Sequence, residues 1–452
     1  MSIGVSNAIF ALVLIGASVL FYRNLSRIRR NILLGRDLDR TDNKPERWKT
    51  MARVALGQSK MVTRPIAGFM HILIYVGFVI INIEVLEIVL DGLFGAHRVF
   101  SGFLGSAYQS FINFFEFLGV LVLFSCIVFL LRRNVQRLAR FHKPEMKGWP
   151  TSDANYILIF EIILMFALLF MNASDGLLMS MSVADLSSAG LDKYNTGING
   201  GFFFSSFLNP LLPSDAASLQ MVERGAWWFH IVGILGFMNY LPYSKHFHIL
   251  LAFPNTWYSN LKEKGSFNNL ESVKKEVELM MDPTADPFSA PAPAEGEVPQ
   301  SFGAKDVKDL SWKQLMDSYS CTECGRCTSE CPANQTGKLL SPRKIMMDTR
   351  DRLEEVGKCI DKNGADHDDG KSLLHDYITP EELWACTTCN ACVEACPVNI
   401  DPLSIIVDLR RFMVMEESAA PAELNGMFTN IENNAAPWQF AQADRLNWVE
   451  ED

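Results

Sequence analysis

Long apolar segments separated by polar connectors fill the first 260 residues, whereas the rest of the chain has no comparable segment. About 20 apolar residues are enough for a helix to cross the hydrocarbon core of a bilayer. Five segments meet this length, at residues 3–22, 65–90, 111–131, 156–178 and 226–251. The pattern therefore predicts a five-helix membrane domain over residues 1–260. The whole-chain averages, with 49% hydrophobic residues and a net charge of −10, conceal this division.

Basic residues are concentrated on alternate connectors of this domain. The connectors at 23–64 and 132–154 are dense in Arg and Lys, whereas the opposite connectors contain little beyond Arg98, Lys193 and Arg224. Basic connectors mark the cytoplasmic side of a membrane. No basic residue precedes the first apolar segment, which is unlike a cleavable signal peptide. We therefore expect a multi-pass protein of the bacterial inner membrane, with the N-terminus outside and residues beyond 260 in the cytoplasm.

The remainder of the chain has helical patterns only. Residues 261–304 predict a short charged helix on the membrane surface and then a Pro-rich linker. Residues 305–415 contain several helix starts marked by Pro and no alternating strand pattern, and residues 416–452 form a polar tail. The expected fold class is therefore all-α, with a five-helix bundle followed by a soluble helical domain.

Two copies of one cysteine pattern lie in this soluble domain. The pattern is Cys-x-x-Cys-x-x-Cys-x-x-x-Cys-Pro, and it is the ligand pattern of ferredoxins with two 4Fe–4S clusters, in which the fourth Cys binds the other cluster. One predicted cluster is held by Cys321, Cys324, Cys327 and Cys396, and the other by Cys386, Cys389, Cys392 and Cys331.

Zinc and disulfide bonds are the alternative interpretations of these eight cysteines. Zinc sites commonly use two separated Cys-x-x-Cys pairs, which leaves the third Cys and the Cys-Pro of each run without a role. Disulfides need an oxidising compartment, whereas the basic connectors predict the cytoplasm. The spacing therefore favours iron–sulfur clusters.

Three histidines of the apolar segments are candidates for binding heme. His71 lies near the cytoplasmic start of the second segment, and His248 lies near the cytoplasmic end of the fifth. His230 lies 18 residues before His248, which is five helical turns and roughly 27 Å along one face of a continuous helix. His246 is then expected near the opposite face, unless Pro242 kinks the helix. His71 and His248 can therefore supply both axial ligands of one b-type heme.

The last apolar segment resembles a known family. The sequence His230-Ile-Val-Gly, together with Leu241-Pro-Tyr-Ser-Lys-His-Phe-His-Ile249, is similar to the last span of the nitrate reductase gamma-subunit family. That family is a five-helix cytochrome b with paired histidines on its second and fifth helices. The resemblance implies heme b at His71 and His248. This chain has Ile81 where the family has a second His, so a second heme at His230 stays open.

The cysteine-rich domain resembles a second family. Residues 305–415 are similar to the all-α ferredoxin modules of succinate dehydrogenase iron–sulfur subunits and of the heterodisulfide reductase C-subunit family. The tail, with Asn430-Ile-Glu-Asn-Asn434, Trp438 and Trp448, resembles a segment that precedes a CCG-type cysteine-rich domain in fused members of the heterodisulfide-reductase-like family. The chain stops at Asp452. The resemblance therefore implies a separate cytoplasmic subunit with that domain, for which the two tryptophans are candidate docking residues.

These features together predict an electron-transfer subunit between the quinone (menaquinone) pool and a cytoplasmic redox partner. Lipid and quinone are the expected membrane partners, and no nucleic-acid partner is expected. The chain has no nucleotide or flavin motif and no catalytic residues, so any enzymatic reaction belongs to a complex of the heterodisulfide-reductase-like or electron-transfer-flavoprotein:quinone type. A heme-free membrane anchor for a ferredoxin module is the alternative. Four acids within or near the spans are candidates for proton transfer to quinone, namely Glu84, Glu87, Glu116 and Glu161.

Overall fold

The computed structural model describes residues 4–196, 201–263, 265–284, 301–365, 367–439 and 441–450. Within these ranges the backbone forms helices, turns and two isolated bridges, between Arg36 and Ser311 and between Leu374 and Ile378. No strand longer than a bridge occurs in these ranges. The all-α prediction is therefore confirmed for the described part of the chain.

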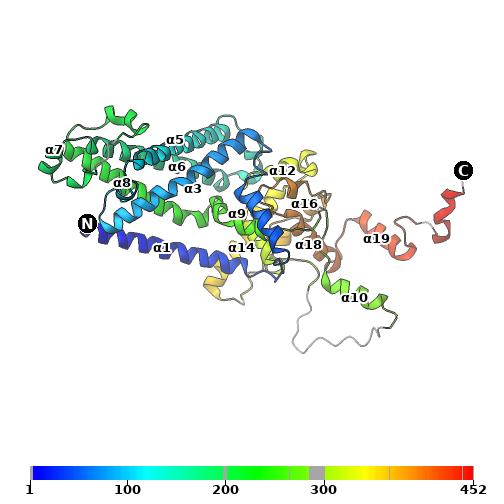
Figure 1. The fold of residues 1–452 in the computed structure, drawn as a ribbon. Coiled ribbons are helices and arrows are strands. Elements are labelled where there is room, and N and C mark those ends of the chain that lie inside the picture. Colours follow the sequence, from blue (N-terminus) through cyan, green and yellow to red (C-terminus); the bar gives the residue numbers. More distant parts are fainter. Residues whose placement is uncertain are drawn as a thin grey trace.

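A bundle of long helices makes up the first half (Figure 1). Four of its helices have the length and apolar composition to cross a membrane: α1 (Val5–Ile32), α3 (Pro65–Phe94), α5 (Ala107–Asn134) and α6 (Trp149–Met179). A further long helix, α8 (Ala216–Tyr240), packs against α1 and α6. Its first half contains Glu223 and Arg224, so it is less apolar than the other four. Four of the five predicted spans thus meet the length and hydropathy expected of a span, and the fifth stays a prediction.

The apolar surface of the bundle faces outward. In the most apolar part of α1 only 6% of the residues are buried, and Val5 and Leu12 are 79% and 70% exposed. Contiguous apolar surface of this extent is unfavourable in water and favourable in lipid. The exposed apolar surface of the bundle therefore fits a lipid environment.

The predicted fifth span, residues 226–251, is not one continuous helix, because α8 ends at Tyr240. Two 3-10 turns follow, at Leu241–Tyr243 and Lys245–Phe247, and a new helix, α9 (His248–Trp257), begins at His248. Pro242 has no N–H to continue the helical hydrogen bonds. The carboxylate of Asp153 on α6 holds the interruption, because it accepts hydrogen bonds from Ser244 Oγ (2.8 Å) and Lys245 N (3.1 Å), and from Tyr240.

The ferredoxin domain packs directly on one end of the bundle (Figure 1). It consists of α11 (Trp312–Ser320), α12 (Arg326–Glu330), α13 (Pro332–Gln335), α14 (Pro342–Asn363), α15 (Leu373–Asp376), α16 (Pro380–Trp384), α17 (Ala391–Ala395) and α18 (Pro402–Met415). A single hydrophobic core joins it to the bundle: Ile28, Phe237 and Phe247 belong to the same cluster as Leu315 and Ile405. Most of the predicted Pro-rich linker, residues 285–300, lies outside the described residues. Direct packing, and not only a linker, therefore connects the two halves.

Two further segments stand apart from both halves. Helix α10 (Glu271–Met281) lies away from the bundle in Figure 1, and its expected position on the membrane surface stays a prediction. The tail contains α19 (Ala422–Asn434), which has no buried residue, and a 3-10 segment at Gln442–Val449. The tail reaches away from the body of the molecule (Figure 1).

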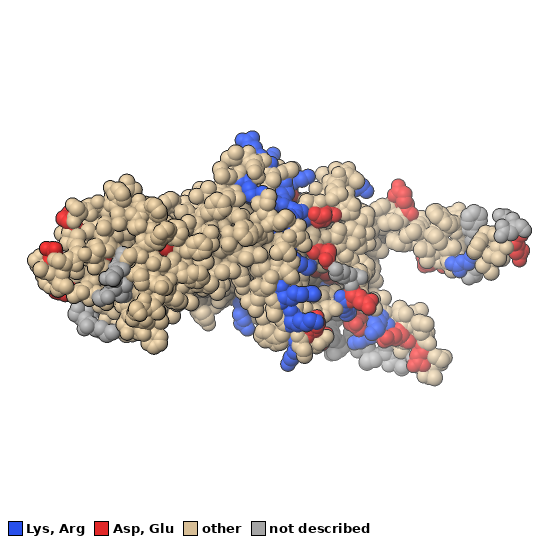
Figure 2. Space-filling view, turned by 45° about the horizontal axis from the view of Figure 1, so that its top comes forward, with Lys and Arg blue, Asp and Glu red and all other residues tan. Residues whose placement is uncertain are grey.

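Charge is unevenly distributed over the surface. Figure 2 shows Lys and Arg gathered in a band at the junction between the bundle and the ferredoxin domain, while the bundle surface beside this band is almost free of charge. The few charges at the opposite end of the bundle are Asp and Glu in this view. The molecule thus has a basic band on one side of its apolar region.

Candidate functional site

The two cysteine runs adopt the same local backbone. In each run the third and fifth residues have positive φ, at Glu323 and Gly325 (54° and 71°) and at Thr388 and Asn390 (57° and 60°). A five-residue helix, α12 or α17, follows in each, and these helices pack on each other. Each fourth Cys is extended and precedes Pro, which starts the next turn. The sequence repeat is therefore also a structural repeat.

The fourth cysteine of each run lies near cysteines of the other run. One small cavity is lined by four cysteines, namely Cys321, Cys324, Cys327 and Cys396. Cys331 is close enough to Cys386 and Cys392 for their charges to interact, and so is Cys389 to Cys386. The structure thus places the first group around one cavity and Cys331 near Cys386 and Cys392, as the crosswise assignment requires. The assignment of each cysteine to a cluster stays a prediction. Among the described residues, no group of three or more His, Cys, Asp or Glu side chains is arranged to hold a single metal ion.

Burial makes thiols of the first cysteine group harder to deprotonate. It raises the pKa of Cys321 and of Cys396 to about 12. Metal-binding thiols are deprotonated, so cluster assembly at these sites must displace the protons. Positive groups lie close by, since Arg350 interacts with the charge of Cys321, and Arg326 with those of Cys324 and Cys396. The surroundings of this group therefore favour an anionic cluster.

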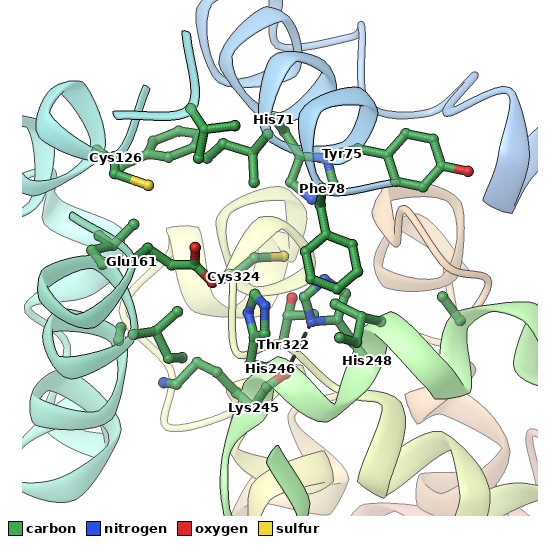
Figure 3. Close-up of a pocket in the computed structure, with 18 of the residues that line it drawn as sticks. His71, Tyr75, Phe78, Cys126, Glu161, Lys245, His246, His248, Thr322 and Cys324 are labelled. Carbon is green, nitrogen blue, oxygen red and sulfur yellow. Dashed lines mark hydrogen bonds between the residues drawn. The ribbon is translucent and has the colours of Figure 1, made fainter. Parts of the chain in front are cut away.

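A cavity of about 440 Å³ lies where the bundle meets the ferredoxin domain (Figure 3). Most of its lining is apolar, and it is reached by all four predicted heme-ligand candidates, His71, His230, His246 and His248. Cys324 of the first cysteine group lines the same cavity and points toward it in Figure 3. The four histidines and Cys324 of the first predicted cluster site therefore line one cavity.

His71 on α3 and His248 at the start of α9 face each other in this cavity. Their ring centres are 6.4 Å apart, with an angle of 39° between the ring planes. Two imidazoles that bind one metal from opposite sides, with bonds of about 2.0 Å, have ring centres roughly 6.3 Å apart. His248 Nδ1 lies 3.1 Å from the carbonyl oxygen of Lys245, which leaves Nε2 available as a ligand. His71 Nδ1 is buried with no hydrogen-bond partner among the described residues. The pair fits a six-coordinate heme iron.

His230 and His246 have different surroundings. His230 is buried, and its Nδ1 lies 3.0 Å from the carbonyl oxygen of Leu164. In the described part of the chain no second histidine faces it: Ile81 lines the cavity, and His97 is held by Asp175 at 2.8 Å. The ring of His246 packs edge-on against that of His248, with centres 5.4 Å apart. The helix is interrupted between Tyr240 and His248, so the exception allowed for Pro242 applies and His246 lines the same cavity as His248.

An ion-pair chain, which the sequence did not indicate, joins the cavity to the first cysteine run. Lys245 pairs with Glu323, and Glu323 Oε1 accepts a hydrogen bond from Arg350 at 2.8 Å. Burial opposes ionisation of Glu323, but Arg350 and Lys245 outweigh it and hold the pKa of the carboxyl below its usual value. Lys245 precedes His246, and Glu323 precedes Cys324. These ion pairs therefore fix the segment that contains His246 and His248 relative to the first cysteine group.

Three of the four candidate acids belong to a polar network at the far end of the bundle. Arg98 donates to Asp175 (2.8 Å) and Glu84 (3.3 Å), and Glu87 accepts from Tyr108 at 2.7 Å. Glu116 likewise accepts hydrogen bonds from the backbone N–H groups of Phe204 and Ser205 and from the Ser205 hydroxyl. Glu161 differs, because it lines the cavity and has no hydrogen bond or ion pair among the described residues. Only this acid is placed to act in the cavity.

Residues 320–400 match the family described as the 4Fe-4S dicluster domain. This range contains both cysteine runs. The chain carries a 4Fe–4S domain, in agreement with the prediction from cysteine spacing.

Nearly the whole chain is similar to two longer proteins. It is 27% identical over 477 residues to a probable iron-sulfur-binding oxidoreductase, FadF, of Bacillus subtilis, covering 99% of this chain and 61% of that protein. It is 26% identical over 466 residues to an EtfAB:quinone oxidoreductase of Syntrophomonas wolfei, covering 98% and 59%. The chain thus spans about three-fifths of the length of these curated relatives.

A shorter match supports the resemblance stated for the ferredoxin domain. The chain is 37% identical over 119 residues to the C-subunit of a CoB-CoM heterodisulfide reductase of Methanosarcina acetivorans, which covers 26% of this chain and 60% of that protein. No solved structure matches. The relatives are therefore iron–sulfur oxidoreductases and heterodisulfide reductase subunits. The resemblance to a nitrate reductase gamma subunit stays a prediction.

Proposed function

We propose that the protein is the membrane subunit of a quinone-linked oxidoreductase complex, which relays electrons between the quinone pool and a cytoplasmic redox partner. One b-type heme at His71 and His248, and two 4Fe–4S clusters, are the proposed carriers. Both kinds of group exchange single electrons. The observation that carries the proposal is the shared cavity, because the histidine pair and Cys324 line the same space.

In this proposal the residues around the carriers have separate roles. The carbonyl of Lys245 orients His248 through Nδ1, as second-shell groups do for metal-binding histidines. The ion pair of Lys245 with Glu323 keeps the first cysteine group at the cavity. The crosswise cysteine groups hold the two clusters side by side, since α12 packs on α17. The apolar lining limits access of water to the histidine pair.

The partner is proposed to meet the second cluster. Cys389 is exposed, unlike the other cysteines of the two runs. It lines an open surface pocket together with Thr388 and Asn390. The tail is close in sequence to this domain, and its Trp438 and Trp448 are 69% and 73% exposed. Exposed tryptophans are favourable anchors at interfaces. We propose a cytoplasmic subunit with a CCG-type domain as the partner, which the similarity to a heterodisulfide reductase subunit supports.

Quinone is the proposed membrane substrate, with Glu161 as the residue that exchanges its proton. This carboxyl group faces the apolar cavity within α6 and has no hydrogen-bond or ion-pair partner among the described residues. An acid inside a membrane domain is energetically costly, and such a residue is therefore a candidate for function. Glu161→Gln is expected to slow reduction by a quinol analogue roughly 10-fold or more while the absorbance spectrum is unchanged. An unchanged rate would remove Glu161 from the proposal.

The basic band supports an orientation in the bacterial inner membrane. It lies at the junction with the ferredoxin domain (Figure 2), and basic groups favour the cytoplasmic side. The proposed topology has α8 as the fifth span, the N-terminus outside and the ferredoxin domain in the cytoplasm.

A reduced-minus-oxidised absorbance spectrum of the full-length protein in detergent tests the function. The expected result is a b-type heme band that disappears in His71→Ala and in His248→Ala. His375→Ala serves as control, because His375 is an exposed histidine of the ferredoxin domain. A quinol analogue is expected to reduce the clusters in wild-type protein and not in the two cavity variants. Absence of the heme band from wild-type protein would favour the heme-free anchor instead.

A further inference from the structure

Two arginines that line the histidine cavity have buried nitrogen atoms without partners. Arg133 lies at the end of α5, and Arg140 lies in the 3-10 turn Ala139–Phe141. Nε and Nη2 of Arg133 and Nε of Arg140 are buried and have no hydrogen-bond partner among the described residues. Both side chains line the same cavity as His71 and His248.

The two guanidinium groups are held in place by one aromatic ring. Their central carbon atoms lie 4.5 and 4.8 Å from the ring centre of Phe141. Stacking on an aromatic face orients a guanidinium group and leaves the N–H donors at its edge available. The arrangement therefore presents donors to the cavity without satisfying them.

The neighbouring acids form their ion pairs with groups other than these two arginines. Among the described residues neither Arg133 nor Arg140 forms a salt bridge, whereas Glu323 pairs with Lys245 and Arg350, and Glu145 pairs with Arg343. Buried charged groups are normally paired and hydrogen-bonded. Two unpaired guanidinium groups in one cavity thus indicate an anionic ligand.

We propose that Arg133 and Arg140 form a carboxylate-binding site that takes the propionate groups of the heme at His71 and His248. The inference rests on the proposed function, because it needs a heme in this cavity. A b-type heme carries two carboxylates, and a guanidinium fork matches the geometry of a carboxylate. The arginines lie near the end of α5 that meets the ferredoxin domain, where the charged edge of the heme is expected. The site would anchor and orient a heme whose iron the histidines hold.

The test compares two forms of heme that differ only in their carboxylates. Full-length protein with its clusters is prepared in heme-deficient cells and titrated in detergent with hemin or with hemin dimethyl ester. Wild-type protein is expected to bind hemin more tightly than the ester, by roughly 10- to 100-fold for each arginine that donates charge-assisted hydrogen bonds. Arg133→Gln and Arg140→Gln are each expected to weaken hemin binding and to leave ester binding nearly unchanged.

Arg137→Gln is the matched control, since Arg137 is an exposed arginine of the same connector. It is expected to change neither affinity. Cluster absorbance in each variant shows that the protein has folded. In variants that retain heme, the midpoint potential is expected to fall, because a positive charge beside the heme favours its reduced form.

Equal binding of hemin and its ester by wild-type protein would overturn the inference while leaving heme binding itself intact. Failure to bind either form would contradict the proposed function instead. Arg140 also lies near enough to Cys324 for their charges to interact. A variant of Arg140 that alters only the cluster signal, with an unchanged preference for hemin, would assign this arginine to the cluster and overturn its role in the site.

Discussion

Lys245 and Glu323 form a nearly buried ion pair between the interrupted helix of the bundle and the first cysteine run of the ferredoxin domain. Their side chains are 10% and 3% exposed. The pair connects two segments that are 78 residues apart in sequence. One segment contains predicted heme ligands, and the other contains predicted cluster ligands. This polar contact joins the two halves in addition to the apolar core that they share.

Replacing Lys245 with Met is expected to destabilise this junction. Glu323 would keep Arg350 as a partner, so we expect a loss of roughly 2 kcal/mol, less than the ~3–5 kcal/mol for a buried charge left fully unpaired. The measurement is chemical unfolding of the full-length protein in detergent. Lys371→Met is the control, because its pair with Glu355 is exposed and should contribute under about 1 kcal/mol. Equal losses in the two variants would contradict a special role for the junction pair.

A single heme per chain is expected, because His71 and His248 are the only histidine pair that faces across the cavity among the described residues. His230→Ala should retain the heme-to-protein ratio of wild-type protein, since no second histidine lies opposite His230. The ratio is measured by pyridine hemochrome absorbance. If His230→Ala lost half of the heme, a second heme site would exist despite Ile81.

Cys331→Ser is expected to damage the second cluster although Cys331 stands in the first run. The crosswise grouping places this thiol with Cys386 and Cys392. Electron paramagnetic resonance of the reduced variant should match that of Cys389→Ser and differ from that of Cys324→Ser. Each variant should lose roughly half of its cluster iron. A spectrum of Cys331→Ser like that of Cys324→Ser would show that each run binds its own cluster.

Asp348 is expected to make the stability of the ferredoxin domain depend on pH. Burial raises the pKa of this carboxyl to about 6, although its salt bridge with Lys344 opposes the rise. The folded protein therefore binds this proton more tightly than the unfolded chain, in which the pKa of Asp is about 3.9. The resulting stabilisation is complete below about pH 4 and is lost as the pH rises through about 6.

Asp348→Asn should remove this dependence. The difference in unfolding free energy between wild type and variant should change by roughly 1–3 kcal/mol between pH 4 and pH 7. Unfolding midpoints measured across this range in full-length protein provide the comparison. A constant difference across the range would show that the carboxyl titrates normally.

Local patterns were sufficient to predict a 4Fe–4S domain and the all-α fold of the described residues. Cluster ligands are defined by short spacings, so Cys321 and Cys324 are recognisable without knowledge of distant contacts. His71 and His248 were predictable as a pair because both lie at the same end of their apolar segments. The structure brings these two rings together across the cavity.

Contacts between distant segments were not predictable. Pro242 indicated a kink, but the interruption also depends on Asp153, about 90 residues earlier, which binds Ser244 and the backbone of Lys245. A helical wheel alone therefore could not place His246. Arg133 and Arg140 looked like ordinary basic connector residues, because only the folded chain shows that part of each side chain is buried in a cavity.

The common core of the two halves has a consequence for how the protein works. A carrier on a flexible tether must swing between donor and acceptor, and its rate then depends on the viscosity of the medium. Here Ile28, Phe237 and Phe247 of the bundle are packed with Leu315 and Ile405 of the ferredoxin domain, which leaves no room for such a swing. In the proposed function, the ferredoxin domain therefore stays fixed to the bundle, and the proposed partner subunit must bind to it there.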